Sequence, residues 1–131
     1  MFNNVITPRF LETDALGHIN NTVLPTWFEA ARDPIFRFFT PDMDVKNWKL
    51  MLATFTVNFH AETHYGVDVE IKTYISRIGN SSFDVYQECW QSGHKTASGT
   101  TTMVHYCHKE KSSQPLTESI LEQMKQHLLQ S

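Results

Sequence analysis

The chain has 131 residues, a formal net charge of −3 and a hydrophobic content of 40%, with nine phenylalanines. This length suits one domain over residues 1–131, and the composition excludes a disordered chain. Lys and Arg are scattered singly, which argues against nucleic acid as a main partner. The chain has no apolar run near the roughly 20 residues of a membrane span and no N-terminal pattern of a signal peptide. We therefore expect a cytoplasmic protein.

The N-terminal third is predicted to form a short strand over residues 4–12, a polar loop over residues 14–20 and a long helix that starts near Asn21. Pro34 lies inside the helical pattern, so the helix is expected to kink or stop near residues 32–33. Apolar residues recur every four positions and form a wide stripe: Val23, Trp27 and Ala31, with Leu24, Phe28, Ile35 and Phe39.

From Met51 the apolar period changes from 3.6 to 2, which predicts long strands joined by tight turns and therefore paired antiparallel. The predicted strands cover residues 51–62, 67–75, 83–90 and 96–108. A last helix is predicted over residues 117–129, on the surface or at an oligomer contact. Its apolar face comprises Leu116, Ile120, Met124 and Leu128.

This order of elements predicts a two-layer α+β domain, in which one long central helix is wrapped by a curved antiparallel sheet. A single helix covers only part of such a sheet. We therefore expect a partner subunit to cover the rest, which favours a homo-oligomer.

Residues 14–21 bring an acid, a glycine, a histidine and two asparagines to the start of the long helix. Asn20 or Asn21 is the expected N-cap. Amides at a helix N-terminus can hold a developing oxyanion, and we assign this role to Asn21, Thr22 and Val23. The Asp14 carboxylate could act as a nucleophile or as a base for water. Asp and Asn before a helix are also common turn and cap residues, so spacing alone leaves both interpretations open.

Three segments resemble one known family. Residues 12–21 read ETDALGHINN and are continued by WFEAAR at residues 27–32. Downstream follow FHAETHYGVDV at residues 59–69 and RIGNSSF at residues 77–83. Together these segments resemble the 4-hydroxybenzoyl-CoA thioesterase-like family, over nearly the whole chain to about His108. The first segment is the most specific, and the others support it by their order and spacing.

The resemblance implies a hotdog fold that hydrolyses the thioester of an acyl-CoA or an acyl-carrier protein. It also implies homodimers or homotetramers with sites at the dimer interface, and no cofactor other than coenzyme A as part of the substrate or product. Asp14 matches the family's catalytic acid, and a thiol leaving group needs no obligatory general acid. His18, Asn20 and Asn21 are the implied helpers. Glu29 and Glu62 are candidates for a second polar group.

The sequence departs from related patterns at three places. Leu16 stands where plant acyl-carrier thioesterases have an asparagine. The G-D pair of the family becomes Gly66-Val67-Asp68, and Pro34 interrupts the central helix.

Two further sets of residues are candidates for substrate contacts. Arg77, Asn80 and Ser82 occupy the turn where members of the family meet the nucleotide part of coenzyme A; an arginine and turn amides can hold a phosphate. These residues could equally form an exposed hairpin turn with an ordinary cation. The acyl-pocket candidates are aromatic residues, which at these spacings are also typical of a plain core: Trp27, Phe28, Phe55, Phe59 and Tyr65.

A metal site is one competing interpretation, because histidine, cysteine and carboxylate side chains alternate on two predicted strands. The residues are His60, Glu62 and His64 on one strand, and His105 and Cys107, with His108 adjacent, on the other. The HExxH helix motif is absent, and we expect no metal. Cys89 and Cys107 are expected to be buried reduced thiols. Two more functions compete with a hydrolase: a non-hydrolytic binder of acyl thioesters, and a dehydratase or hydratase of the same fold.

Overall fold

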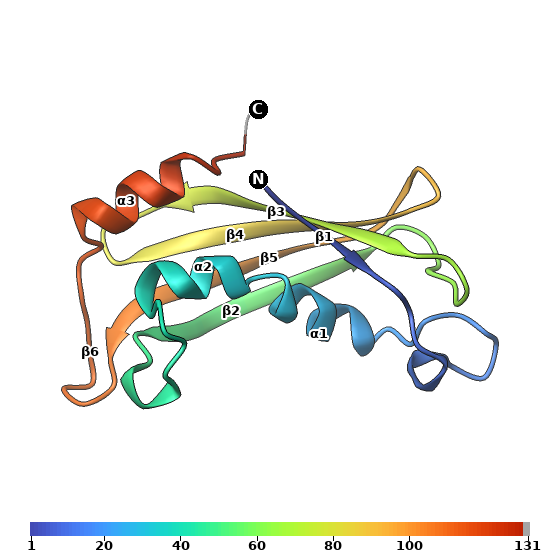
Figure 1. Cartoon of the computed structure of the whole chain (residues 1–131), viewed down its shortest axis with the longest axis horizontal. Coiled ribbons are helices and arrows are strands. Elements are labelled where there is room, and N and C mark those ends of the chain that lie inside the picture. The colour runs from blue at the N-terminus through green and yellow to red at the C-terminus, as the bar shows by residue number, and fades with distance from the viewer. Residues whose placement is uncertain (130–131) are drawn as a thin grey trace.

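The structure is a computed structural model and describes residues 1–129. Its main element is a 6-stranded antiparallel sheet in the order β1-β3-β4-β5-β2, with β6 added beside β5 (Figure 1). The strands are β1 (Phe2–Ile6), β2 (Leu50–Phe59), β3 (Val69–Ile78), β4 (Ser82–Gln91), β5 (His94–Cys107) and β6 (Ser112–Ser113). The four predicted long strands are therefore confirmed, with ends shifted by one to three residues.

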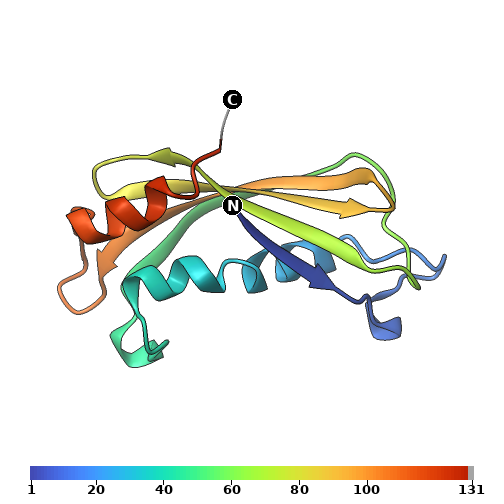
Figure 2. The same ribbon diagram turned by 45° about the horizontal axis from the view of Figure 1, so that its top comes forward.

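Two short helices replace the single long central helix, so that prediction was wrong. They are α1 (Val23–Ala30) and α2 (Asp33–Phe39), which follow one another along the same side of the sheet (Figures 1 and 2). The interruption predicted near residues 32–33 is confirmed. Its cause is Pro34, which has no N–H to donate to the preceding turn, so the helical hydrogen-bond ladder ends and restarts there.

The helices cover two apolar clusters on the concave face of the sheet. One cluster lies under α2 and α3 (Glu118–Lys125), and the other lies under α1. Between them the three central strands contribute polar side chains, Thr73, Gln87 and Thr101, all at most 4% exposed. Arg32, from the junction of α1 and α2, reaches this polar seam and donates to Gln87 and Thr101. The helix break thus places one arginine between two apolar layers.

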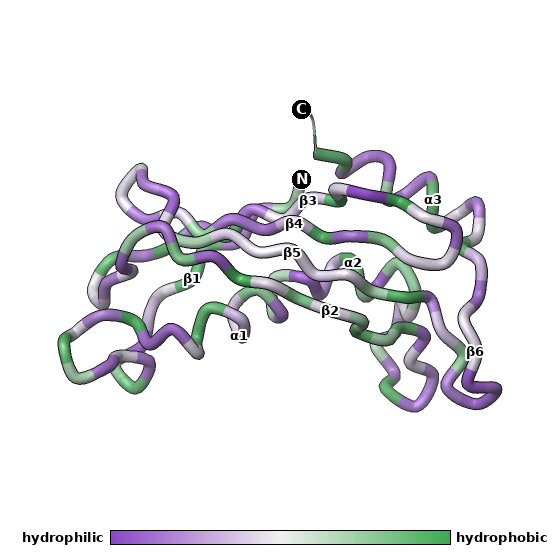
Figure 3. Tube along the Cα trace, turned by 180° about the vertical axis from the view of Figure 1, so that it is seen from behind, coloured by the Kyte–Doolittle hydropathy of each residue, from purple (hydrophilic) through white to green (hydrophobic). Residues whose placement is uncertain are grey.

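The opposite face of the sheet carries alternating polar residues, which gives β3 and β4 the mixed colouring seen from behind in Figure 3. Side chains pair across the strands there: Lys95 with Glu88, and Tyr74 with Tyr86. Lys72 also lies over the ring of Trp90. This face therefore needs no helical cover.

Strand β2 forms one edge of the sheet and is exposed along most of its length, although it was predicted to be half-buried. The register shifts between Leu52 and Thr54, so the bulge at Ala53 breaks the predicted alternation. Four of its apolar residues are at least 40% exposed: Met51, Leu52, Phe55 and Phe59.

The chain ends differ from the predicted boundaries. Residues 4–12 are divided between β1 and a 3-10 turn, Phe10–Glu12, because Pro8 separates the two. Helix α3 packs on the first cluster through Ile120 and Met124 and stops at Lys125. Beyond the helix, Leu128 forms an isolated bridge with Ile75 of β3, whose backbone bonds to both His127 and Leu129.

Two smaller points concern the described residues. Cys89 is buried as expected, whereas Cys107 is partly exposed. No helix within residues 1–129 combines the length and the apolar character needed to cross a lipid bilayer.

Candidate active site

A cavity of about 410 Å³ lies where the loop before α1 meets the end of β2. The chain enters it twice, at residues 14–24 and at residues 59–63. The first segment supplies Asp14, His18, Ile19, Asn20, Asn21 and Leu24, and the second supplies Phe59, His60, Ala61, Glu62 and Thr63. Five of the six predicted catalytic residues therefore share one cavity, which we call the Asp14 cavity.

Asp14 holds its own loop in shape. Its Oδ1 accepts hydrogen bonds from the amides of Leu16 at 2.7 Å and His18 at 3.1 Å. The Asp14 amide donates to the His18 carbonyl at 2.7 Å, and Gly17 between them has a φ of 79°, which favours glycine. The second oxygen, Oδ2, has no hydrogen-bond partner among residues 1–129 and remains available to a ligand.

His18 links the two segments of the cavity. Its Nε2 lies 3.0 Å from Glu62 Oε2, and its ring meets the ring of His64 edge-on at 5.0 Å between centroids. The backbone joins the same segments, since the Ile19 amide donates to the Thr63 carbonyl at 2.7 Å. The side chain of Glu62 is 64% exposed and that of His18 is 25% exposed, and both line the cavity.

The start of α1 offers fewer amides than predicted. Thr22, not Asn20 or Asn21, is the N-cap residue. Asn20 Oδ1 accepts from the Thr22 amide at 3.0 Å, and the Asn20 carbonyl accepts from the Val23 amide at 2.9 Å. Two of the three amides assigned to the oxyanion are therefore already occupied. The amides of Asn21 and Leu24, both at the cavity, have no acceptor in the described part of the chain.

Glu12 supports this loop and was missed by the sequence analysis. It is 5% exposed, and its carboxylate accepts from the Arg9 amide at 2.7 Å and from the Trp27 indole at 2.9 Å. Its carbonyl accepts from the Asn20 amide at 2.8 Å. Burial by itself raises the pKa of Glu12, but the hydrogen bonds from Arg9 and Trp27 outweigh it and hold the pKa below its ordinary value.

Replacing Glu12 by glutamine should lower the free energy of unfolding at about pH 7 by about 1–3 kcal/mol, because the buried charge-assisted bonds are lost. Because the pKa of Glu12 is lower in the folded chain than its ordinary value of 4.5, the ionised carboxylate stabilises the fold at pH values above 4.5. This stabilisation is lost as the pH falls through the lower pKa of the folded state. Denaturant unfolding at about pH 7 and about pH 4 should therefore show a smaller acid loss in Glu12→Gln than in the wild type. The exposed Glu110→Gln is the control, and equal acid losses in all three proteins would contradict the role of Glu12.

The other predicted residues differ in whether they line the Asp14 cavity, line a neighbouring cavity or pack elsewhere. Glu29 points from α1 into a neighbouring cavity and is not among the residues that line the Asp14 cavity. Phe59 lines the Asp14 cavity and Phe28 the neighbouring one. Trp27 is 4% exposed and is held by Glu12, whereas Tyr65 is 48% exposed and packs against the ring of Phe10.

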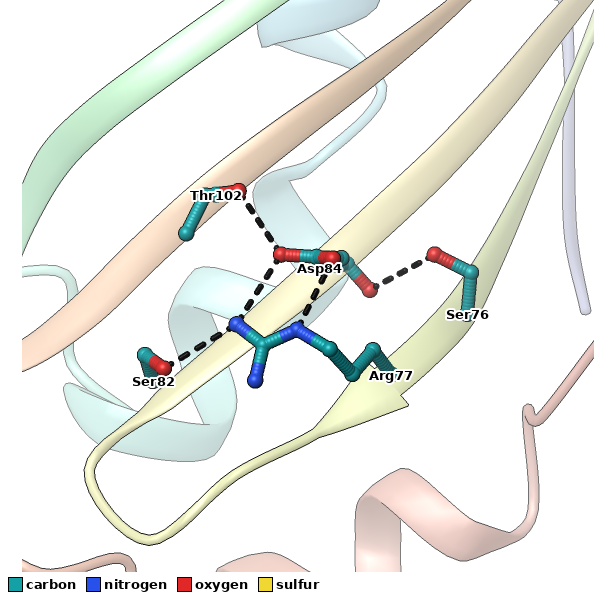
Figure 4. Close-up of polar contacts among 5 residues, drawn as sticks. All are labelled: Ser76, Arg77, Ser82, Asp84 and Thr102. Carbon is teal, nitrogen blue, oxygen red and sulfur yellow. Dashed lines mark hydrogen bonds and ion pairs between the residues drawn. The ribbon is translucent and has the colours of Figure 1, made fainter.

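The predicted nucleotide contacts lie at the β3–β4 turn, where Arg77 is already engaged (Figure 4). Its Nε and Nη2 donate to the two carboxylate oxygens of Asp84 at 2.9 and 3.1 Å, and Nη2 also donates to Ser82 at 3.0 Å. The hydrogen bond to Asp84 raises the pKa of Arg77. Only Nη1 is without a partner in residues 1–129, and the exposed Asn80 lies in the turn itself.

The competing metal interpretation gains no geometric support within the described residues. No three His, Cys, Asp or Glu side chains among them lie close enough to hold a metal ion. His60 instead bonds to Ser98 at 2.8 Å, and His105 and His108 bond to backbone carbonyls.

Comparison with known proteins assigns the family. The model of the thioesterase-like superfamily matches residues 8–124. A solved structure of a predicted thioesterase from Bacillus stearothermophilus is 40% identical, with a TM-score of 0.95 over 99% of this chain and 98% of that one. No curated protein matches the sequence.

Other solved structures extend the likeness. A thioesterase from Thermus thermophilus, complexed with coenzyme A and Zn, is 25% identical, with a TM-score of 0.83 over 94% of this chain and 96% of that one. A 1,4-dihydroxy-2-naphthoyl-CoA thioesterase from Synechocystis shares the fold at 18% identity, with a TM-score of 0.82 over 95% of each chain. The curled antiparallel sheet and these neighbours fit the hotdog fold, with two short helices in the central position.

Proposed function

Because this chain belongs to the thioesterase-like superfamily, we propose that it hydrolyses the thioester of an acyl-CoA, or of an acyl-carrier protein, to a free acid and a thiol. The observation that carries the proposal is the Asp14 cavity, which combines a carboxylate oxygen without a partner, unbonded amides at the start of α1 and the His18–Glu62 pair. The likeness to a thioesterase complexed with coenzyme A supports a coenzyme A ester as the substrate.

In this proposal the thioester carbonyl oxygen accepts hydrogen bonds from the amides of Asn21 and Leu24. These donors stabilise the negative charge that develops on that oxygen during attack. Thr22 and Val23 take no direct part, because their amides bond to Asn20. Their role is to hold the first turn of α1 in place.

Asp14 Oδ2 either removes a proton from the attacking water or attacks the carbonyl carbon itself. In the first route, hydroxide adds, the carbon–sulfur bond breaks and the proton on Asp14 passes to solvent. In the second, an acyl anhydride on Asp14 forms as the thiolate leaves, and water then hydrolyses it. The thiolate leaves without an obligatory acid because a thiol pKa is roughly 8.5.

His18 and Glu62 orient the water or the carbonyl in this scheme, and Asn20 shapes the loop. Glu62 holds His18 Nε2 at 3.0 Å and thereby fixes the direction of the ring. Glu29 contributes to the neighbouring cavity and not to the bond-breaking step. Arg77, Asn80 and Ser82 remain the proposed contacts to the coenzyme A phosphates, with Arg77 Nη1 as the available donor.

We also propose that the protein assembles as a homodimer or homotetramer through β2. This edge strand has no neighbour beyond β5 within residues 1–129, and it exposes Met51, Leu52, Phe55 and Phe59. A long apolar edge strand is an aggregation hazard unless another chain covers it. Since Phe59 lines the Asp14 cavity, a second subunit at β2 would also border the active site.

A panel of short, long, branched and aromatic acyl-CoA esters, assayed for released thiol, tests the activity. We expect hydrolysis of at least one class, with a KM that rises with salt if Arg77 holds a phosphate, and with a weaker salt effect in Arg77→Ala. Tight binding of the esters without thiol release would favour a non-hydrolytic binder. Hydration of an enoyl ester without thiol release would favour a hydratase. Either result overturns the hydrolase assignment.

A further inference from the structure

Arg32 is a buried cation whose hydrogen bonds are incomplete. It is 7% exposed, and its Nη1 donates to the neutral oxygens of Gln87 and Thr101, each at 3.2 Å. Its Nε–H is buried and has no partner, the only such side-chain nitrogen or oxygen found within residues 1–129. A buried unpaired donor on a charged group is costly, so a ligand that accepts this hydrogen bond would be favoured.

The charge of Arg32 has no ion-pair partner in the part of the chain that the structure describes. Glu29, the acid that acts on it electrostatically, is exposed. Gln87 is itself held in place, because its Nε2 donates to the Phe28 carbonyl and to Thr73. Gln87 and Thr101 therefore orient the guanidinium through its Nη1, and no residue of the polar seam accepts from Nε–H.

Arg32 lies where two cavities meet between the helices and β2. One, of about 150 Å³, runs along α1 and has walls from Phe28, Phe55 and Val57. The other, of about 410 Å³, continues under α2 to Phe36 and Trp48. Both include Arg32 and Leu52, and we call the two together the α1–β2 groove. Its lining combines apolar walls with the exposed carboxylates of Glu29 and Asp33, and its buried charged group is Arg32.

The α1–β2 groove leads away from the Asp14 cavity along the same two elements. On α1 the Asp14 cavity ends at Leu24 and the groove begins at Pro25. On β2, Phe59 borders the Asp14 cavity opposite Ala97, and Phe55 borders the groove opposite Thr101. Phe55 and Phe59 are four residues apart on β2, which corresponds to a rise of about 13 Å along the strand. This rise approximates the distance from the thioester carbonyl in the Asp14 cavity to Arg32.

Building on the proposed thioesterase function, we propose that the α1–β2 groove receives the acyl chain and that Arg32 selects acyl groups with an oxygen acceptor about 13 Å from the thioester. The acceptor, a hydroxyl or a carboxylate, takes the hydrogen bond that Arg32 Nε–H lacks. Arg32 is thus a specificity-determining residue. The apolar walls bind the intervening methylene groups.

Binding of non-hydrolysable thioethers of coenzyme A tests this without requiring turnover. Three compounds of equal chain length, long enough to span about 13 Å, end in a methyl, a hydroxyl or a carboxylate. Calorimetry on the wild type should show at least about tenfold tighter binding of the hydroxyl or the carboxylate compound than of the methyl compound, as expected for a hydrogen bond to a charged group. The two oxygenated compounds distinguish a neutral from an anionic acceptor.

Arg32→Met should remove this preference while still binding the methyl compound, and the exposed Arg37→Met is the matched control that should keep it. A purely structural arginine would change all affinities together and leave the ratio intact. Equal wild-type affinity for the three compounds, or no binding of any, overturns the inference even if Arg32→Met fails to fold. If the proposed hydrolase function is wrong, no ester in the hydrolysis panel releases thiol. That result is independent of the binding ratios measured with the three thioethers.

Discussion

Replacing Asp14 by asparagine is expected to lower kcat for acyl-CoA hydrolysis by at least about a hundredfold, the scale of a lost positioned base. The substitution is mild for the loop, because an amide oxygen can still accept from the amides of Leu16 and His18 as Oδ1 does. Thermal unfolding should therefore change little. The measurement is thiol release at saturating ester, alongside the melting temperature.

Asp14→Ala separates chemistry from loop shape. If Asp14 only shapes the loop, Asp14→Asn keeps near-normal turnover and only Asp14→Ala is impaired, which would contradict the catalytic role. Asp42→Asn is a matched control, since Asp42 also accepts a backbone amide, that of Asp44, in an exposed turn. It should retain full activity.

A single turnover in isotopically labelled water tests the direct attack of Asp14 on the carbonyl. Label that enters the Asp14 carboxylate indicates direct attack on the carbonyl, because the acyl anhydride is then opened by water at either carbon. Label found solely in the released acid is expected from water activated by Asp14, and equally from an anhydride opened at its acyl carbon. Both results retain Asp14 in the reaction.

Charged substitutions on β2 are expected to dissociate the assembly. Met51→Lys and Leu52→Lys each place a charge on the exposed edge strand, and burying an unpaired charge in an interface should weaken association at least about a hundredfold. The single chain should stay folded, because both side chains are at least 40% exposed within it. Sedimentation at several protein concentrations gives the association constant.

Val45→Lys is the control, since Val45 is 77% exposed but lies in the 3-10 turn Val45–Asn47 before β2 and not on the strand. It should leave the assembly unchanged. A wild-type protein that stays monomeric at every concentration would contradict the proposed assembly. Met51 lines neither the Asp14 cavity nor the α1–β2 groove. If the dissociated Met51→Lys is also less active, the second subunit contributes to the site beside Phe59.

Local patterns in the sequence predicted the long strands and the polar loop that feeds a helix. Alternation at period 2 located β3, because every second side chain along most of it is buried. Burial also alternates along β4, whereas β5 is buried on both faces over residues 96–99. The same alternation misjudged β2, where a bulge at Ala53 and an edge position changed which side chains are covered. Pro34 indicated the helix break because its effect on the backbone is local.

The partners of the site residues depended on the tertiary structure. His18 and Glu62 are 44 positions apart, and only the pairing of two loops brings them within 3.0 Å. The bond between Glu12 and Trp27 and the seam of Arg32, Gln87 and Thr101 likewise join distant segments. Hydrogen bonds between side chains on different strands leave no periodic signal in the sequence.

By itself the sequence determined the family resemblance and the Asp14 loop at the start of a helix, because both depend on residues that are neighbours along the chain. The tertiary structure decided which amides of that helix are unbonded, which carboxylate meets His18 and which arginine is buried beside the groove. The physical reason is that burial and hydrogen-bond satisfaction depend on chain segments far apart in sequence, which come together only when the sheet folds around the helices.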